Sequence, residues 1–299
     1  MPIEHALGIR ATKHDISKTP HKNSTTTQGG SNTTQTGSGT SGKYFDRVVL
    51  IVMENQDYDV AMKDKYLKNL ASEYNGKILT KYLATTHPSQ PNYIALISGS
   101  TKGTKEDDES NIDRNSIVDL LEKKGISWKS YQEDYPGGCN KNMDIGLYAR
   151  KHNPFMSFTN ISKDKKRCAK IVNSKQLDKD ISSNSVPQFV FYTPNLNNDA
   201  HDTNMSYGSK WLKKFLSERI QKKAFNENTM FVVTFDEDDG GSDDNQVMTV
   251  LFGPDFRLSS KKRTDSNKYD HYSLLRTIED NWSLGDLGQH DKNAKLIAL

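Results

Sequence analysis

The chain has 299 residues, a formal net charge of +3 and a pI near 8.5, which is enough length for one large domain with a sizeable core. Its basic residues are scattered lysines rather than an arginine-rich face, so we expect no nucleic-acid partner. There is no run of about 18 apolar residues, so we expect no integral membrane segment.

The first 43 residues differ in composition from the rest. Thr, Ser, Gly, Asn and Gln dominate, and aromatic residues are absent. This composition predicts a disordered segment over residues 1–43, followed by a single domain over residues 44–299. The segment lacks the apolar core of a signal peptide. Asn-x-Ser/Thr sequons, among them those at Asn23, Asn32, Asn160 and Asn204, nevertheless favour a secreted or cell-surface glycoprotein.

The first predicted strand covers residues 45–53. Its continuous Val, Leu and Ile run is typical of a strand buried on both faces in a parallel sheet. Glu54 and Asn55 follow directly, at the edge where open α/β sheets bind ligands. Glu54 is therefore either a metal ligand or an ordinary loop carboxylate.

A predicted helix over residues 64–74 and a strand over residues 77–83 lead to a candidate nucleophile, Ser89. Pro91 suits a first helical position and residues 98–100 a helix stop, so Ser89 is expected just before a short helix. Backbone N–H groups and the helix dipole would stabilise a phosphate oxygen there, and Asn92 would add an amide donor. An ordinary N-cap is the alternative for Ser89.

The elements that follow continue the alternation of helix and strand. A helix is predicted over residues 116–124 and a strand over residues 126–131, which favours βαβ units and a mostly parallel central sheet with helices on both faces. Residues 132–175 are poor in periodicity and hold Cys139 and Cys168, so we expect a disulfide-braced insertion; two free thiols of a cytosolic protein are the alternative. His152 in this insertion either binds phosphate or metal or caps a turn.

Two further predicted strands also end in polar residues. The strand over residues 189–193 precedes His201 and Asp202, which either both bind a divalent ion or form a pair in which Asp202 orients His201. A helix is predicted over residues 209–222. The strand over residues 230–235 precedes six acids in nine residues, beginning with Asp236 and Glu237. The spacing does not fit a calcium hand, so metal binding competes with a solvated acidic loop.

The last predicted elements are a strand over residues 247–252 and a helix over residues 272–282. Asp270 is a plausible N-cap for this helix, and His271 falls in its first turn. A protonated imidazole is unfavourable at a helix N-terminus, which favours a neutral, ligating or phosphate-facing role for His271.

These groups would converge on one edge of the sheet. Carboxylates and imidazoles suit divalent cations, and a metal ion is a usual means of activating a serine hydroxyl. The pattern therefore indicates phosphoryl transfer through a covalent phosphoserine.

Several collinear segments resemble the secreted acid phosphatase and phospholipase C family of phosphoesterases, especially its fungal acid-phosphatase branch. They are VMENQDYD, THPSQPNYIALISGS, KHNPF, PNLNNDAHDT, TFDEDDGG and DHYSLLRTIEDNW, and the resemblance covers residues 43–284. It implies an α/β fold like that of the alkaline-phosphatase superfamily. It also implies the following site residues: Glu54, Asn55, Ser89, Asp236 and Glu237 at metal and nucleophile positions, Asn92 at a phosphate position, and His201, Asp202 and His271 on the side of a second metal or the leaving group.

The sequence departs from this family where Glu237 replaces a His of the two-zinc relatives. The ion is therefore one of Zn, Ca, Mg, Mn or Fe, in one or two copies. We expect a metal-assisted acid phosphatase acting on small soluble phosphate monoesters. The alternatives are a phospholipase C or other phosphodiesterase with the same site, and a non-catalytic metal- or glycan-binding surface protein.

Overall fold

The computed structural model describes residues 40–299 except 242–243, 257 and 260–261. Most of the predicted disordered segment, residues 1–39, lies outside the described residues. At its end, the Gly42 N–H donates to Asp46 Oδ1 at 3.1 Å, and the Lys43 N–H donates to Asn281 O at 2.8 Å. The folded domain therefore begins slightly before residue 44.

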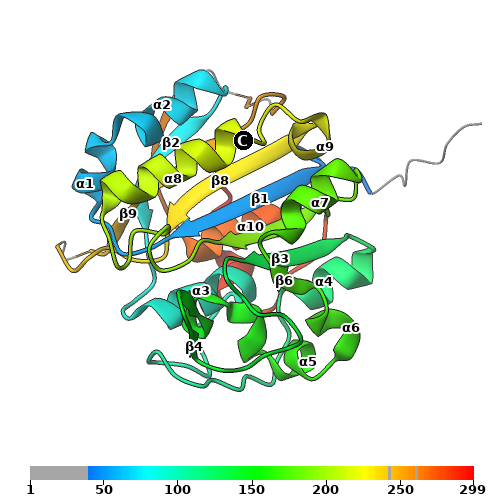
Figure 1. Ribbon diagram of the computed structural model, residues 1–299. Helices are drawn as coiled ribbons and strands as arrows, with labels where there is room; N and C mark the ends of the chain where they lie inside the picture. Colours follow the sequence, from blue (N-terminus) through cyan, green and yellow to red (C-terminus); the bar gives the residue numbers. More distant parts are fainter. Residues whose placement is uncertain (1–39, 242–243, 257, 260–261) are drawn as a thin grey trace, which may run out of the picture. The chain divides into compact units, whose positions relative to one another are not determined.

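An eight-stranded sheet forms the centre of the domain (Figure 1). Among its described strands, β9 alone is antiparallel to its neighbours. The prediction of a mostly parallel α/β sheet is thus confirmed. In spatial order the strands are β10 (Thr264–Asp270), β2 (Lys77–Leu83), β9 (Gln246–Phe252), β8 (Thr229–Phe235), β1 (Arg47–Met53), β7 (Phe189–Thr193), β3 (Trp128–Gln132) and β6 (Ile171–Asn173).

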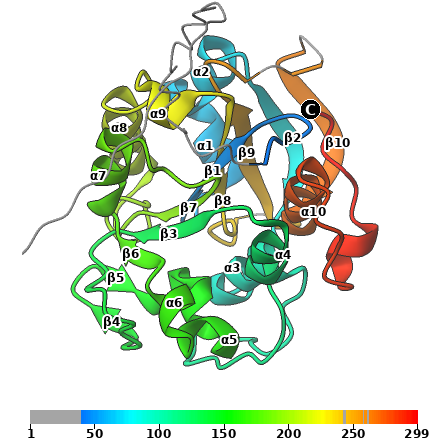
Figure 2. The same ribbon diagram turned by 90° about the vertical axis from the view of Figure 1, so that its right-hand side faces the viewer.

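Helices cover both faces of this sheet, as Figures 1 and 2 show from two directions. Because both faces are covered, every residue of β8 and all of β1 after Arg47 is buried, which explains their continuous apolar sequences. One face carries α1 (Tyr58–Lys63), α2 (Lys65–Glu73), α7 (Gln176–Ser182), α8 (Met205–Ser217) and α9 (Lys223–Asn226). The other carries α3 (Ser89–Ser98), α4 (Ile117–Lys124) and α10 (His271–Asn281).

The central strands and most of the longer helices lie where the sequence predicts them, but several elements differ. The helix expected over residues 209–222 is α8, which begins earlier because Asn204 Oδ1 accepts a hydrogen bond from the Tyr207 N–H at 3.1 Å. Strand β10, with the polar sequence TDSNKYD, was not predicted. Helices α1 and α7 and strand β6 were not predicted.

The predicted insertion contains mostly short elements. They are β4 (Asp144–Ile145), β5 (Tyr148–Ala149), the 3₁₀ turns η1 (Arg150–His152) and η2 (Pro154–Ser157), α5 (Thr159–Ser162), α6 (Lys165–Cys168) and the edge strand β6. The Cys139–Cys168 disulfide is present, which confirms the predicted bridge. A further 3₁₀ turn, η3 (His290–Asn293), follows α10. No helix among the described residues combines the length and apolar composition needed to cross a membrane.

Candidate active site at the carboxyl edge of the sheet

The carboxyl ends of four strands bring the predicted site residues together. Strand β1 leads into Glu54 and Asn55, and β8 leads into Asp236 and Glu237. Strand β2 leads through residues 84–88 to Ser89, and β7 leads to the loop of residues 194–204. Because these strands are parallel, their ends meet at one edge of the sheet.

Ser89 is the point on which the polar groups converge. Its Oγ lies 2.9 Å from Glu237 Oε1, 3.2 Å from Glu54 Oε2 and 3.5 Å from Asn55 Oδ1. Ser89 is the first residue of α3, with Pro88 at the N-cap, so it lies one position further into the helix than predicted. Its hydroxyl therefore has carboxylate acceptors on one side and a helix N-terminus on the other.

Asn92 has a different role from the expected one of phosphate donor. Its Oδ1 accepts from the Thr85 and Thr86 N–H groups at 2.9 and 3.0 Å. Its Nδ2 donates to Thr86 O at 2.7 Å and to Pro88 O at 3.2 Å. The carboxamide is thus engaged with the backbone that precedes Ser89, and in this arrangement it has no donor left for a phosphate.

Three buried carboxyl groups lie close together at this edge: Glu54, Asp199 and Asp236. Burial raises the pKa of Glu54 well above its ordinary value, and the charges of Asp236 and Asp199 raise it further. Burial likewise raises the pKa of Asp199 to about 7, and it raises that of Asp236, to which the charge of Glu237 also contributes. These acids repel one another, so a cation between them would stabilise their ionised forms.

Unsatisfied polar atoms also fit a cation. Among the described residues, the carboxylate atoms Asp199 Oδ2 and Asp236 Oδ2 are buried without a hydrogen-bond partner. Buried polar atoms are nearly always paired, so two orphaned carboxylate oxygens among neighbouring acidic groups point to a bound ion. The residues present therefore fit a divalent metal.

His152 joins this group from the insertion. Its Nε2 lies 3.1 Å from Glu54 Oε1, and its ring stacks on that of Tyr93 at 5.2 Å. Burial lowers the pKa of His152 well below its ordinary value, so the ring stays neutral and one of its nitrogens keeps a free lone pair. One ligand atom from each of Glu54, His152 and His201 lies within 4.8 Å of the others, which is close enough to share an ion.

His201 and Asp202 form the second of the two predicted arrangements. His201 Nδ1 lies 2.7 Å from Asp202 Oδ1, while His201 Nε2 lies 3.3 Å from Lys151 Nζ. The Asp202 side chain is 46% exposed. The observed contact is thus that of a residue that orients His201, and not that of a metal ligand.

Both ring nitrogens of His271 have partners inside the protein. Its Nε2 lies 2.7 Å from Asp236 O and its Nδ1 lies 3.1 Å from the Tyr82 hydroxyl. Burial lowers its pKa to about 4, which keeps the ring neutral. In this arrangement the ring holds the backbone of Asp236, and a role of His271 at the leaving group stays a prediction.

Four residues at this edge were not predicted to function there: Tyr93, Asp199, Lys151 and His87. The Tyr93 hydroxyl donates to Glu54 Oε1. Lys151 Nζ lies 3.1 Å from Asp107 Oδ2, and His87 Nδ1 contacts Glu237 Oε2. Tyr93 follows Ser89 by four residues, a spacing that places both on one helix face and could have revealed it.

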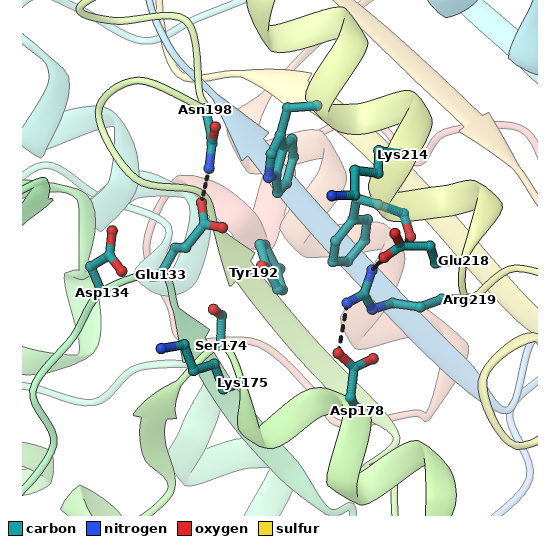
Figure 3. Close-up of a pocket in the computed structure, with 12 residues that line it drawn as sticks. Glu133, Asp134, Ser174, Lys175, Asp178, Tyr192, Asn198, Lys214, Glu218 and Arg219 are labelled. Atoms are coloured by element: carbon teal, nitrogen blue, oxygen red, sulfur yellow. Dashed lines mark hydrogen bonds and ion pairs between the residues drawn. The ribbon is translucent and has the colours of Figure 1, made fainter.

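A separate cavity of about 340 Å³ lies between α7 and α8, and Asn198 of the 194–204 loop forms part of its wall (Figure 3). Its polar wall groups mostly bond to one another. Asn198 Nδ2 donates to Glu133 Oε2 at 2.7 Å, and Arg219 Nη2 donates to Asp178 Oδ2 at 2.7 Å. Glu133 also accepts from the Asn195 N–H at 2.9 Å, so this wall supports the loop that carries Asp199.

Comparison with known proteins identifies a family and several relatives of this chain. The chain matches the model of the phosphoesterase family over residues 61–285. It is 38% identical over 267 residues to a probable acid phosphatase of Kluyveromyces lactis, covering 86% of this chain and 63% of that one. It is 40% identical over 265 residues to the phosphate-repressible acid phosphatase of Penicillium chrysogenum, covering 86% and 64%. The chain thus spans less than two thirds of the length of these fungal relatives.

A bacterial relative is matched over more of its length. The chain is 32% identical over 250 residues to the phosphatidylinositol-3-phosphatase of Mycobacterium tuberculosis, covering 82% of this chain and 79% of that one. Among solved structures, an alkaline phosphatase superfamily protein from Vibrio parahaemolyticus aligns with a TM-score of 0.58 at 12% identity, covering 86% of this chain and 70% of that one. This likeness shows the fold.

Proposed function

The chain belongs to the phosphoesterase family, and from this premise we propose that it is a metal-assisted acid phosphatase that hydrolyses small phosphate monoesters through Ser89. One observation carries the proposal: Ser89 Oγ lies within 3.5 Å of Glu54, Asn55 and Glu237 at a helix N-terminus. An ordinary N-cap serine would not require two buried carboxyl groups, of Glu54 and Glu237, and the half-buried Asn55 around its hydroxyl.

A divalent ion would be held by Glu54, Asn55, Asp236 and Glu237, where it would favour ionisation of the Ser89 hydroxyl and neutralise phosphate oxygens. The orphaned Asp236 Oδ2 supports this assignment. His152 and His201, on the other side of Glu54, are the residues that would hold a second ion if there is one.

The proposed covalent step uses groups that already lie within hydrogen-bond distance of each other. Ser89 Oγ attacks phosphorus, its proton passes to Glu237 Oε1 at 2.9 Å, and the phosphorus–oxygen bond to the leaving group breaks. If His201 holds no second ion, the leaving oxygen would keep the electron pair and take a proton from this residue, whose Nδ1 lies 2.7 Å from Asp202 Oδ1. Water then attacks the phosphoserine, His201 takes its proton, and Glu237 returns a proton to Ser89.

The remaining groups would position the phosphate. Lys151 Nζ lies 3.3 Å from His201 Nε2. Burial lowers the pKa of Lys151, but the negative charges of Asp107, Glu54 and Asp236 outweigh this effect, so its pKa is raised. It therefore stays charged and can neutralise a phosphate oxygen. The N-terminal N–H groups of α3 would bind another.

We also propose that the protein is secreted or displayed on the cell surface. The Cys139–Cys168 disulfide supports this location, because such bridges persist in oxidising compartments.

The test begins with Ser89→Ala, with Ser98→Ala at the other end of α3 as the matched control. Ser89→Ala should lower kcat for a chromogenic monoester by at least about a thousandfold while circular dichroism is unchanged. Ser98 bonds only to the backbone of its own helix and of Ser100, so its variant should keep near-normal turnover. Near-normal turnover by Ser89→Ala would contradict the proposal.

Metal dependence and substrate class need separate measurements. Activity should disappear on chelation and return with one ion among Zn, Ca, Mg, Mn and Fe. Chelation-insensitive activity in protein that elemental analysis finds free of metal would refute metal assistance. A panel of soluble monoester, diester and phosphatidylinositol 3-phosphate then separates the proposed reaction from a phosphodiesterase or lipid phosphatase, and binding of metal without turnover would indicate a non-catalytic protein.

A further inference from the structure

The described residues contain three Asn-x-Ser sequons, at Asn160, Asn204 and Asn281. The Asn281 side chain is buried, and its Oδ1 accepts from the Tyr44 and Phe45 N–H groups while its Nδ2 donates to Phe45 O. The fold treats the other two differently.

Asn160 is half-buried in the insertion. Its Nδ2 donates to both carboxylate oxygens of Asp119 at 3.1 Å, and its backbone carbonyl accepts from Arg167 Nη1 at 3.2 Å. Ser162, the hydroxyl residue of this sequon, is buried. A sugar on Asn160 would displace Asp119 and open this packed cluster.

Asn204 is arranged in the opposite way. It is exposed and forms the N-cap of α8, where its Oδ1 accepts from the Tyr207 N–H at 3.1 Å. Its Nδ2 makes no hydrogen bond to any described residue, and Ser206 of this sequon is also exposed. The cap needs only the oxygen, so substitution of the nitrogen leaves the helix start intact.

We propose that Asn204 carries an N-linked glycan and that Asn160 is unmodified in the folded protein. The glycan on Asn204 would be transferred from a lipid-linked oligosaccharide diphosphate, which is the donor. The Nδ2–C1 bond forms as the C1–O bond to the diphosphate breaks, one amide proton is lost, and the lipid diphosphate leaves with the electron pair. This inference rests on the export of the chain through a secretory pathway, as proposed above.

Tyr207 provides a second feature of this site. Its side chain is 47% exposed, although large apolar groups are usually covered. It lies three residues after Asn204, a spacing that places neighbouring side chains on one side of a helix. An aromatic ring in this position offers an apolar face to the first sugar, and that contact would cover it.

The position of Asn204 connects the glycan to the candidate active site. Asn204 ends the loop that supplies Asp199 and His201, and this loop is tied by the Asp202 N–H to Leu196 O at 2.8 Å and by Thr203 Oγ1 to Asn197 O at 2.7 Å. The glycan would therefore extend from a firmly held loop beside the catalytic edge. Small soluble substrates would still enter, because the modified nitrogen faces solvent.

The test uses the full chain, directed into the secretory pathway of a yeast host by an added leader sequence. Glycans are released by peptide-N-glycosidase F in heavy-oxygen water, which converts each modified asparagine to a mass-labelled aspartate, and peptides from secreted and retained protein are mapped by mass spectrometry. We expect label at Asn204 and none at Asn160. An unlabelled Asn204, or a labelled Asn160 in folded protein, overturns the proposal.

Two serine variants serve as matched controls. Ser206→Ala removes the Asn204 sequon but keeps the cap, so it should lose the mobility shift caused by that glycan with kcat/KM for a soluble monoester unchanged within about twofold. Ser162→Ala removes the Asn160 sequon and should leave the glycan pattern unchanged; loss of label in this variant contradicts the assignment. Turnover is measured on the same samples, so a glycosylated but inactive protein would refute the phosphatase proposal alone.

Discussion

Ser89 and Tyr93 lie one turn apart on α3, and both contact the buried carboxylate of Glu54. Ser89 approaches Oε2 and Tyr93 donates to Oε1, so a single helix face holds the proposed nucleophile and orients the proposed metal ligand beside it. The Tyr93 ring also stacks on His152, which connects the two sides of the site. Tyr93 is thus a positioning residue whose hydroxyl and ring have separable effects.

Tyr93→Phe should weaken metal binding or turnover by about tenfold to a hundredfold, because Glu54 loses the donor that orients it. The ring remains, so stability should change little. Calorimetric titration of the metal-free protein with the activating ion, together with kcat, would measure this. Unchanged affinity and unchanged kcat would show that the hydroxyl does not orient Glu54.

Glu279 in α10 provides a prediction about pH. Its carboxyl is fully buried, and burial, assisted by the charge of Asp291, raises its pKa from its ordinary 4.5 to about 9. Asp291 accepts from the Leu287 and Gln289 N–H groups at 2.6 and 2.9 Å, so two backbone donors hold its carboxyl group in place near Glu279.

The folded state therefore binds a proton at Glu279 that the unfolded chain releases above its ordinary pKa. This contribution to the free energy of unfolding is fully present below pH 4.5 and is lost as the pH rises towards about 9. Glu279→Gln mimics the protonated acid and should flatten the decline in the free energy of unfolding between about pH 5 and about pH 8. Urea unfolding of both proteins across this range measures the slopes; equal slopes would contradict the assignment.

The loop of residues 85–88 depends on a single side chain of the following helix. Asn92 satisfies two N–H groups and two carbonyls of this loop, and the loop in turn sets the direction from which Ser89 enters α3. Removal of the carboxamide would leave the half-buried Thr85 and Thr86 N–H groups without this acceptor, although Asn245 Nδ2 would still donate to Thr86 O at 2.8 Å.

Asn92→Ala should lower the free energy of unfolding by about 2 to 4 kcal/mol and kcat by about a hundredfold, because a small displacement of Ser89 is costly. Asn92→Asp, which keeps the acceptor and loses the donors, should lie between the wild type and Asn92→Ala in stability. Urea unfolding and steady-state kinetics check both effects. Full stability with impaired phosphate binding would instead restore the direct phosphate role that the sequence suggested.

The elements differ in how well local sequence predicts them. Strands β7 and β8 lie close to where they were expected, because a strand buried along its whole length needs a largely apolar run of the right length. Strand β10 escaped prediction because it is an edge strand with a mostly exposed pattern, so its sequence carries only two buried positions, Asp265 and Tyr269. Its identity as a strand depends on pairing with β2, which is a long-range event.

The disulfide acts over the whole insertion. Cys139 and Cys168 are 29 residues apart with their Cα atoms at 5.7 Å, and the segment between them contains Lys151 and His152. Replacing both cysteines by serine should lower the free energy of unfolding by about 3 to 4 kcal/mol, as expected for closure of a loop of this length.

Chemical denaturation of the double variant tests that value, and thiol titration of the native protein should find no free thiol without reductant. Because the bridge encloses His152, kcat should fall as well. A double variant with wild-type stability would show that the packing of the insertion suffices without the bridge.

The amino-acid sequence was sufficient for the sheet class and for the acids that follow β1 and β8, because these depend on short apolar runs and on the residues next to them. It was also sufficient for the disulfide and the family, which were inferred from the two cysteines and from collinear motifs. The roles of Asn92, His271 and Asp202 could not be read in the same way. Each depends on which backbone or side-chain group the folded chain brings within hydrogen-bond distance, and those groups come from other elements or from loop geometry. His152 lies close to Glu54 because the insertion folds back over the edge of the sheet. The two residues are about a hundred positions apart in the sequence, and local sequence patterns carry no information over such a separation.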